Sequence, residues 1–200
     1  MLTMMTPHRP DVDHQPGPAG PAPAMTPPVS PGPQLPPGVT MTAGIMPGTS
    51  GVHFSLPSGV VVDLQAGTVV GGGVSPFHIP ANLTAAFGTA HNDIILGNSQ
   101  PDFLAGGAGN DILMGRSGGA TFEPGSGNDQ AIGAGTNNTV DYLDANGPVR
   151  VDLATHIAVK AGGGVDQLVN INNIRGPSTT IRSSAIRATT SSTTATDRTP

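Results

Sequence analysis

Carboxylate side chains recur at a fixed spacing in the middle of this 200-residue chain. Asp93, Asp102, Asp111 and Asp129 are separated by nine residues or by a multiple of nine, and each ends a short polar run. Residues 88–141 hold six acidic side chains against one arginine, Arg116, and so account for the whole formal charge of −5. Carboxylates at such a spacing suit a hard cation such as Ca²⁺, and the negative charge argues against nucleic acid as a partner.

A nine-residue register organises this segment. From Gly88 the chain divides without a gap into the blocks GTAHNDIIL, GNSQPDFLA, GGAGNDILM, GRSGGATFE, PGSGNDQAI and GAGTNNTVD. The first six residues of a block favour a tight turn, because Gly, Asn and Asp tolerate positive φ, and the last three form a short strand with one apolar side chain at position 8. Two blocks then make one coil of 18 residues, and successive coils pair their strands at about 4.8 Å.

Alternate blocks stack on the same side of such a coil. One side therefore carries Asp93, Asp111 and Asp129 at position 6, whereas the other side carries Asp102, Ala120 and Asn138. Like charges at strand spacing repel each other, so the stack needs a cation, and the glycine-rich turns offer carbonyl oxygens as further ligands. We predict the best calcium sites between blocks one and three and between blocks three and five, with few or weak sites opposite.

The block GGAGNDILM meets the pattern G-G-x-G-x-D-x-U-x at every specified position. PGSGNDQAI meets it less well, and GRSGGATFE lacks the acidic residue. Residues 88–141 resemble the RTX (haemolysin-type) calcium-binding repeat family, with a weaker likeness over 59–176. The resemblance implies an all-β fold, a right-handed parallel β-roll, with Ca²⁺ between the turns of adjacent coils. The implied ligand residues are Asp93, Asp111, Asp129, Asp102, Gly107, Gly109, Gly125 and Gly127.

Two flanking segments, 59–87 and 142–177, also resemble each other. VVVDLQAGTVVGGG at 60–73 is echoed by VRVDLATHIAVKAGGG at 149–164, with two extra residues before the glycines of the second copy. Apolar residues at period two around an Asp predict half-buried strands that extend the solenoid at its ends. Asp63 and Asp152 are then either calcium ligands or solvent-facing strand residues, and strand propensity favours the second interpretation.

The two ends of the chain differ in composition from the rest. Residues 1–58 contain 14 of the 21 prolines and predict a disordered Pro-rich arm or linker. Residues 178–200 predict a disordered Ser/Thr-rich tail. A translational frame change near Gly176 is a second interpretation of this tail, because Thr-Thr and Ala-Thr pairs arise when Asp and Gly codons are read one base out of phase. The chain has no cysteine, so disulfides and Cys-based zinc sites are excluded.

No catalytic motif fits its required context. Residues 115–119, GRSGG, satisfy G-x-S-x-G, but Ser117 lies inside the nonapeptide register with no helix former after it. We therefore expect calcium-driven folding of a non-enzymatic repeat protein. Two alternatives are the accessory calcium-binding part of a secreted hydrolase or toxin, and a surface or adhesive spacer module with a cell-surface or polysaccharide target.

The sequence contains no apolar window long enough to span a bilayer, and its first residues do not predict a cleaved N-terminal signal. The resemblance implies an extracellular protein exported by type I secretion machinery.

Overall fold

The computed structural model describes residues 34–43, 50–176, 179–182 and 187–188. The described residues from Leu35 onward belong to one compact unit, which is the subject of the following paragraphs. Its described residues form strands and turns without a helix, so they include no helical segment that could cross a membrane. The predicted all-β class is confirmed.

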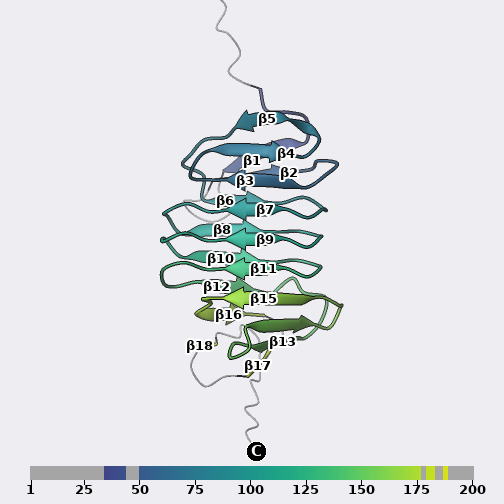
Figure 1. The fold of residues 1–200 in the computed structure, drawn as a ribbon, viewed down its shortest axis with the longest axis vertical. Coiled ribbons are helices and arrows are strands. Elements are labelled where there is room, and N and C mark those ends of the chain that lie inside the picture. The colour runs from purple at the N-terminus through teal and green to yellow at the C-terminus, as the bar shows by residue number, and fades with distance from the viewer. Residues whose placement is uncertain (1–33, 44–49, 177–178, 183–186, 189–200) are drawn as a thin grey trace, which may run out of the picture. The chain divides into compact units, whose positions relative to one another are not determined.

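The nonapeptide strands alternate between two sheets, as Figure 1 shows. One sheet contains β6 (Ala85–Phe87), β8 (Asp102–Ala105), β10 (Ala120–Glu123) and β12 (Thr139–Asp141), and all neighbours among them are parallel. The other sheet contains β7 (Ile94–Leu96), β9 (Ile112–Met114) and β11 (Gln130–Ile132), again in parallel. The chain therefore crosses from one sheet to the other at every turn, and each strand pairs with the strand 18 residues further on.

The core is a row of apolar side chains between the two sheets. Ile95, Leu113 and Ala131 are aligned on one side, and Leu104, Phe122 and Val140 are aligned on the other. All six occupy position 8 of their blocks and are fully buried. Because a three-residue strand buries only one large side chain, the coils depend on backbone pairing between neighbours as well as on this narrow core.

Antiparallel hairpins flank the parallel strands. At one end β3 (Val60–Asp63), β4 (Thr68–Gly71) and β5 (Val74–His78) pair in antiparallel order, and β3 joins β7 in parallel. At the other end β13 (Val149–Asp152), β14 (Ile157–Lys160) and β15 (Val165–Val169) do the same, and β15 joins β11. Both hairpins lie in the ten-stranded sheet, which is therefore mixed, and the parallel arrangement predicted for the whole solenoid does not extend to these hairpins.

The two flanking copies fold alike because they share a turn. Asp63 accepts hydrogen bonds from the backbone of Gln65 and Ala66, and Asp152 accepts them from Ala154 and Thr155. Each turn is closed by a residue with positive φ, Gly67 at 65° and His156 at 60°. Both aspartates therefore shape hairpin turns.

Strands also occur where the sequence predicts disorder. Within the predicted arm, β1 (Val39–Ala43) pairs with β2 (Ser50–Phe54), and β2 pairs in parallel with β6. The proline run ends at Pro37. In the strand that follows later, the apolar side chains of Val52 and Phe54 alternate along the chain and are buried. Residues 1–33 of the arm lie outside the described part of the chain.

At the C-terminal end, the predicted β segment ends in a strand and the predicted tail contains two more. β16 (Asn173–Arg175) continues the repeat sheet from β12. In the predicted tail, β17 (Thr179–Arg182) pairs with β13, and β18 (Arg187–Ala188) pairs with β16. Short strands add to the open edges of the two sheets there, because an edge strand presents unpaired backbone groups. The remaining tail residues lie outside the described part, and the frame-change hypothesis stays a prediction.

Candidate metal centre

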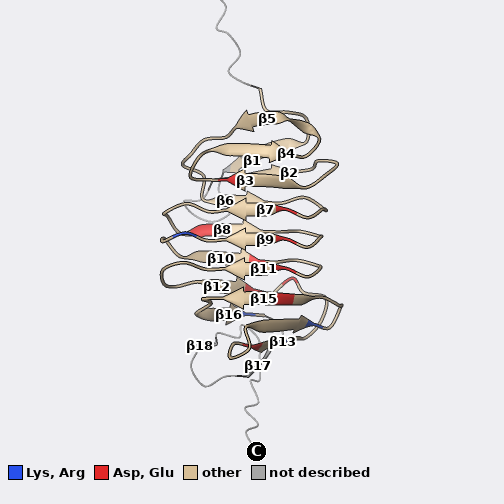
Figure 2. Cartoon of the chain, viewed as in Figure 1, with Lys and Arg blue, Asp and Glu red and all other residues tan. Residues whose placement is uncertain are grey.

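Four aspartates form a buried column along one edge of the solenoid. Asp93, Asp111 and Asp129 immediately precede β7, β9 and β11, and Figure 2 shows these acidic segments one above another. Parallel pairing of the following strands stacks them at intervals of one coil. Asp166 of β15 continues the column below Asp129, because Gln167 pairs with Gln130. None of the four is more than 1% exposed, so four carboxylates are withdrawn from water together.

One oxygen of each carboxylate binds the coil before it. Oδ1 of Asp111 accepts the backbone N–H of Asp93 at 2.8 Å, and Oδ1 of Asp129 accepts that of Asp111 at 2.9 Å. Oδ1 of Asp166 likewise accepts the N–H of Asp129 at 3.0 Å. At the upper end, Oδ1 of Asp93 accepts the N–H of Val60 at 2.7 Å. The carboxylates thus connect successive coils, which explains why each must be buried.

The second oxygen distinguishes the members of the column. Oδ2 of Asp93 accepts the backbone N–H of Thr89 at 2.6 Å, and the Thr89 hydroxyl also contacts this carboxylate. Oδ2 of Asp129 binds the ammonium of Lys160 at 2.8 Å, and Oδ2 of Asp166 accepts the hydroxyl of Tyr142 at 2.9 Å. Oδ2 of Asp111 is buried and has no hydrogen-bond partner. A charged oxygen in this situation is costly unless a cation or a proton accompanies it.

The electrostatics of Asp111 reflect the same deficit. The pKa of Asp111 is raised to about 7, mainly by burial and also by the charges of Asp129 and Asp93, although the backbone hydrogen bond from Asp93 and the charge of Lys160 lower it. The carboxyl therefore holds a proton far more readily than an exposed aspartate does. A cation bound beside it would reverse this preference.

The turn glycines allow the coils to approach closely. Gly107, Gly109, Gly125 and Gly127 all have positive φ, between 87° and 126°. A Cβ on Gly107 would overlap the carbonyl oxygen of Thr89, and a Cβ on Gly125 would overlap that of Gly107. The position 2 carbonyls therefore point along the stack, where the Gly107 oxygen accepts the N–H of Ser126 at 2.9 Å.

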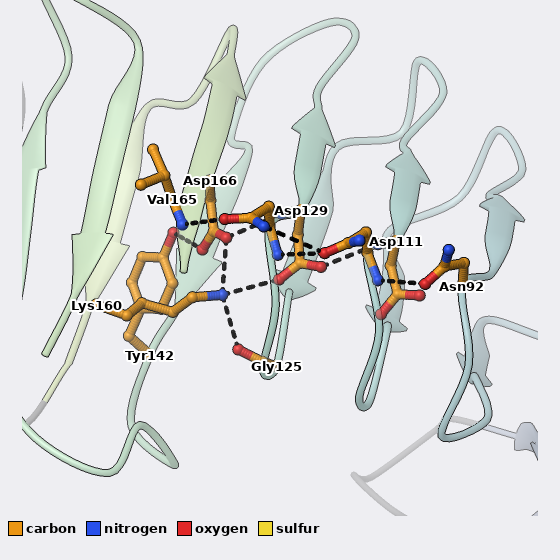
Figure 3. Close-up of polar contacts among 10 residues, drawn as sticks. Asn92, Asp111, Gly125, Asp129, Tyr142, Lys160, Val165 and Asp166 are labelled. Atoms are coloured by element: carbon orange, nitrogen blue, oxygen red, sulfur yellow. Dashed lines mark hydrogen bonds and ion pairs between the residues drawn. The ribbon is translucent and has the colours of Figure 1, made fainter. Parts of the chain in front are cut away.

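Lys160 contributes a cation at the lower end of the column. Its Nζ lies 2.9 Å from the carbonyl oxygen of Gly125, 2.8 Å from Oδ2 of Asp129 and 2.7 Å from Oδ1 of Asp166. Figure 3 shows the ammonium between the two carboxylates, with the Gly125 carbonyl as its third contact. The side chain comes from β14 and is 6% exposed, so the pair with Asp129 is buried on both sides.

A second ladder of asparagines runs beside the aspartates. Oδ1 of Asn92 accepts the backbone N–H of Asn110, and Oδ1 of Asn110 accepts that of Asn128, both at 2.8 Å. Oδ1 of Asn128 accepts the N–H of Val165 at 2.8 Å. Position 5 thus binds the following coil while position 6 binds the preceding one, so the two side chains support the stack in opposite directions.

The opposite edge of the solenoid carries a different column. Asp102 pairs with Ala120 across β8 and β10. The backbone N–H of Ala120 donates a hydrogen bond to Oδ1 of Asn138 at 3.2 Å. The backbone N–H of Asn138 in turn donates to Oδ1 of Asn172 at 2.9 Å. Burial raises the pKa of Asp102 to about 6, and its Oδ1 is also unpartnered, but no second carboxylate stacks against it. The two edges therefore differ in charge as the position 6 residues predict.

The sequence analysis did not identify Asp166 of the column or Lys160, which binds its lower end. Asp166 belongs to a further nonapeptide, AGGGVDQLV at 161–169, which is out of phase with the first six blocks because the intervening hairpin is not a multiple of nine residues long. Searching for the pattern without a fixed phase would have found it. Lys160 has no local sequence signal apart from being the only lysine of the chain.

A catalytic serine in GRSGG would need a later His and Asp, and His156 and Asp141 follow Ser117 in the sequence. Ser117 lies in an exposed turn between β9 and β10. The Nδ1 of His156 contacts the carbonyl of Leu168 at 3.1 Å, and Asp141 pairs with Arg175 at 2.8 Å. Both groups that could have served Ser117 are therefore engaged elsewhere.

Side chains alone do not complete a metal site. Among the described residues no three His, Cys, Asp or Glu side chains lie close enough together to hold a metal ion. Calcium does not require such a group, since it also takes backbone carbonyl and water oxygens. The unpartnered Asp111 oxygen, the stacked carboxylates and the aligned carbonyls form a donor set of hard oxygens that fits Ca²⁺.

Comparison with known proteins agrees with this donor set. Residues 87–121 match the family model of the RTX calcium-binding nonapeptide repeat, which comprises four copies. Comparison with curated proteins found no match. The matched segment spans the turns of Asp93, Asp102 and Asp111, and its repeats carry the alternating strands described above. Residues 87–121 of this chain are therefore similar to RTX calcium-binding nonapeptide repeats.

Proposed function

We propose that the chain binds Ca²⁺ in the Asp93, Asp111 and Asp129 column and that binding drives its folding into a right-handed β-roll. The observation that carries this proposal is the buried, unpartnered Oδ2 of Asp111 between two further buried carboxylates. Three carboxylates stacked without cations repel one another, whereas Ca²⁺ between them would convert repulsion into attraction. Right-handedness is supported by the strong general preference for right-handed crossovers between parallel strands.

Lys160 indicates which oxygens a cation would use. Its ammonium contacts a position 2 carbonyl, the position 6 carboxylate of the same block and the position 6 carboxylate of the next coil. One coil higher, the equivalent oxygens are the Gly107 carbonyl, Oδ2 of Asp111 and the Asp129 carboxylate. We propose these as protein ligands of the principal calcium ion, with further oxygens to reach the usual six to eight.

A further candidate site lies one coil above the Gly107 site, and there the Asp93 carboxylate already has hydrogen-bond partners. There the equivalent oxygens are the Thr89 carbonyl, Oδ2 of Asp93 and the Asp111 carboxylate. The Thr89 amide and hydroxyl already bind the Asp93 carboxylate. The sequence predicts comparable sites above and below Asp111, whereas these hydrogen bonds favour the lower one.

The proposed compartment rests on the similarity to RTX calcium-binding repeats. Extracellular calcium modules bind with dissociation constants of about 10⁻⁴–10⁻³ M, which suits millimolar calcium outside cells and leaves the sites free inside. We therefore propose an extracellular, non-catalytic module. Export by type I machinery rests on the family resemblance. A role as the accessory part of a larger hydrolase or toxin, or as a surface spacer, remains compatible with calcium binding.

Isothermal titration calorimetry on Asp111→Ala and Asp102→Ala tests the proposal. Asp111 is shared by two neighbouring turns, whereas Asp102 faces Ala120, so the first substitution should remove more bound calcium than the second. Equal losses would contradict the assignment to the Asp111 column, and no binding by the unsubstituted chain would contradict calcium binding itself.

A further inference from the structure

The Lys160 ammonium is surrounded by oxygen atoms in the way that a bound metal cation would be. The ammonium has three donors and meets three oxygens, from Gly125, Asp129 and Asp166, at 2.7–2.9 Å. The residue is 7% exposed, and the carboxylate partners are fully buried. The remaining oxygen of Asp166 is fixed by Tyr142 at 2.9 Å, so no acceptor around the ammonium is left without a partner.

The position of the ammonium matches the proposed calcium position in the coil above. Its three oxygens are one carbonyl from position 2 and two carboxylates from position 6 of successive coils. Because the strands of these coils are in register, a shift by one coil carries this set onto Gly107, Asp111 and Asp129. The position between Gly125, Asp129 and Asp166 is therefore occupied by the Lys160 ammonium. The equivalent position between Gly107, Asp111 and Asp129 has no cationic side chain among the described residues.

The flanking duplication shows that the lysine is specific to one end. In the β13–β14 hairpin Val149 pairs with Lys160, and in the β3–β4 hairpin the corresponding Val60 pairs with Gly71. Lys160 therefore occupies the strand position at which the first copy has Gly71. At the first end the column is closed by a backbone donor instead, the Val60 N–H on Asp93.

We propose that Lys160 is a tethered cation that takes the place of a calcium ion at the last level of the column. The inference rests on the proposed calcium function for the levels above. The lower end of the array is then closed without metal, and the lysine determines how many ions the column binds. Replacing it by a neutral side chain should create one additional calcium site from Gly125, Asp129 and Asp166.

The test compares Lys160→Met with Arg150→Met in the full chain, using calcium alone as the probe. Methionine keeps an unbranched apolar stem in place of the lysine stem, and Arg150 is an exposed cation on the paired strand β13. Calorimetry should give one more bound ion for Lys160→Met than for the unsubstituted chain. Circular dichroism should show that this variant needs several-fold more calcium to fold. Arg150→Met should match the unsubstituted chain in both measurements.

Unchanged stoichiometry in Lys160→Met, with unchanged calcium dependence, would overturn the inference. Lys160→Gln, which keeps a hydrogen-bond donor without the charge, is measured in parallel, and failure of both variants to fold at any calcium concentration would also overturn it. If no protein responds to calcium, the proposed function fails separately. Thermal unfolding in a chelator then decides, because a tethered cation requires Lys160→Met to melt below Arg150→Met, whereas equal melting temperatures would refute it.

Discussion

Replacing Asp111 by asparagine should stabilise the calcium-free protein and abolish most of its response to calcium. Burial and the charges of Asp129 and Asp93 raise the pKa of Asp111 from 3.8 to about 7. At 1.36 kcal/mol per pKa unit, ionising this carboxyl lowers the free energy of unfolding by about 4 kcal/mol. Asparagine keeps an oxygen for the Asp93 N–H and removes the charge, so Asp111→Asn should be more stable than the unsubstituted chain by up to about 4 kcal/mol at pH 8 in a chelator.

The pH dependence gives the sign of this effect. Because the folded-state pKa of Asp111 is raised, its protonated form favours folding. Without calcium, the unsubstituted chain should therefore lose stability as the pH rises from about 3.9, the value in the unfolded chain, to about 7. Asp111→Asn lacks this contribution, so the difference between the two proteins should grow across that window and stay constant above it.

Calcium should act on only one of the two proteins. An ion at one hundred times its dissociation constant adds about 2.7 kcal/mol per site to the unsubstituted chain, and Asp111→Asn should gain much less. Far-UV circular dichroism at pH 8 in chelator measures the first effect as a larger folded fraction of Asp111→Asn, and urea unfolding in calcium measures the second. Asp102→Asn is the control: burial raises the pKa of Asp102 to about 6, so this variant should gain about 3 kcal/mol in chelator yet keep the calcium response. Equal calcium gains in all three proteins would refute the reasoning.

Three further substitutions test the scaffold by thermal or urea unfolding in calcium. Asn110→Ala removes the acceptor of the Asn128 N–H on an exposed edge and should cost about 1 kcal/mol, with calcium stoichiometry unchanged; loss of an ion would contradict a purely structural ladder. Gly109→Ala places a Cβ against the backbone of His91 at a φ of 124° and should cost about 1–3 kcal/mol, whereas Gly162→Ala meets nothing within 4 Å and should be near neutral; similar costs would argue against close coil contact at Gly109. Phe122→Ala empties the largest fully buried side chain and should cost about 3–5 kcal/mol, and a cost below about 1 kcal/mol would show that the narrow core contributes little.

The nonapeptide period predicted the parts of the fold that repeat. A fixed register of nine places Asp93, Asp111 and Asp129 on one edge and Asp102 on the other, because each block supplies one turn and one strand. It also identifies the buried position 8 side chains, such as Leu113 and Phe122, which are fully buried. These features follow from local spacing, so no long-range information was needed.

The closing elements could not be predicted in the same way. Lys160 reaches Asp129 only because the β13–β14 hairpin lies beside β15, and this pairing depends on turns and strand contacts far apart in the sequence. Asp166 was missed because the hairpin shifts the nonapeptide phase. The difference between Asp93 and Asp111 also depends on geometry, since it arises from Thr89 at position 2, where the later block has Gly107.

Far-UV circular dichroism of the full chain during a calcium titration tests the central claim most directly. If cations between the stacked carboxylates stabilise the coils, calcium should produce a transition from coil to β-structure with a midpoint of about 10⁻⁴–10⁻³ M. Magnesium at the same concentrations should have a smaller effect, because it requires a tighter octahedral site. A spectrum that stays unchanged well above millimolar calcium would contradict the account.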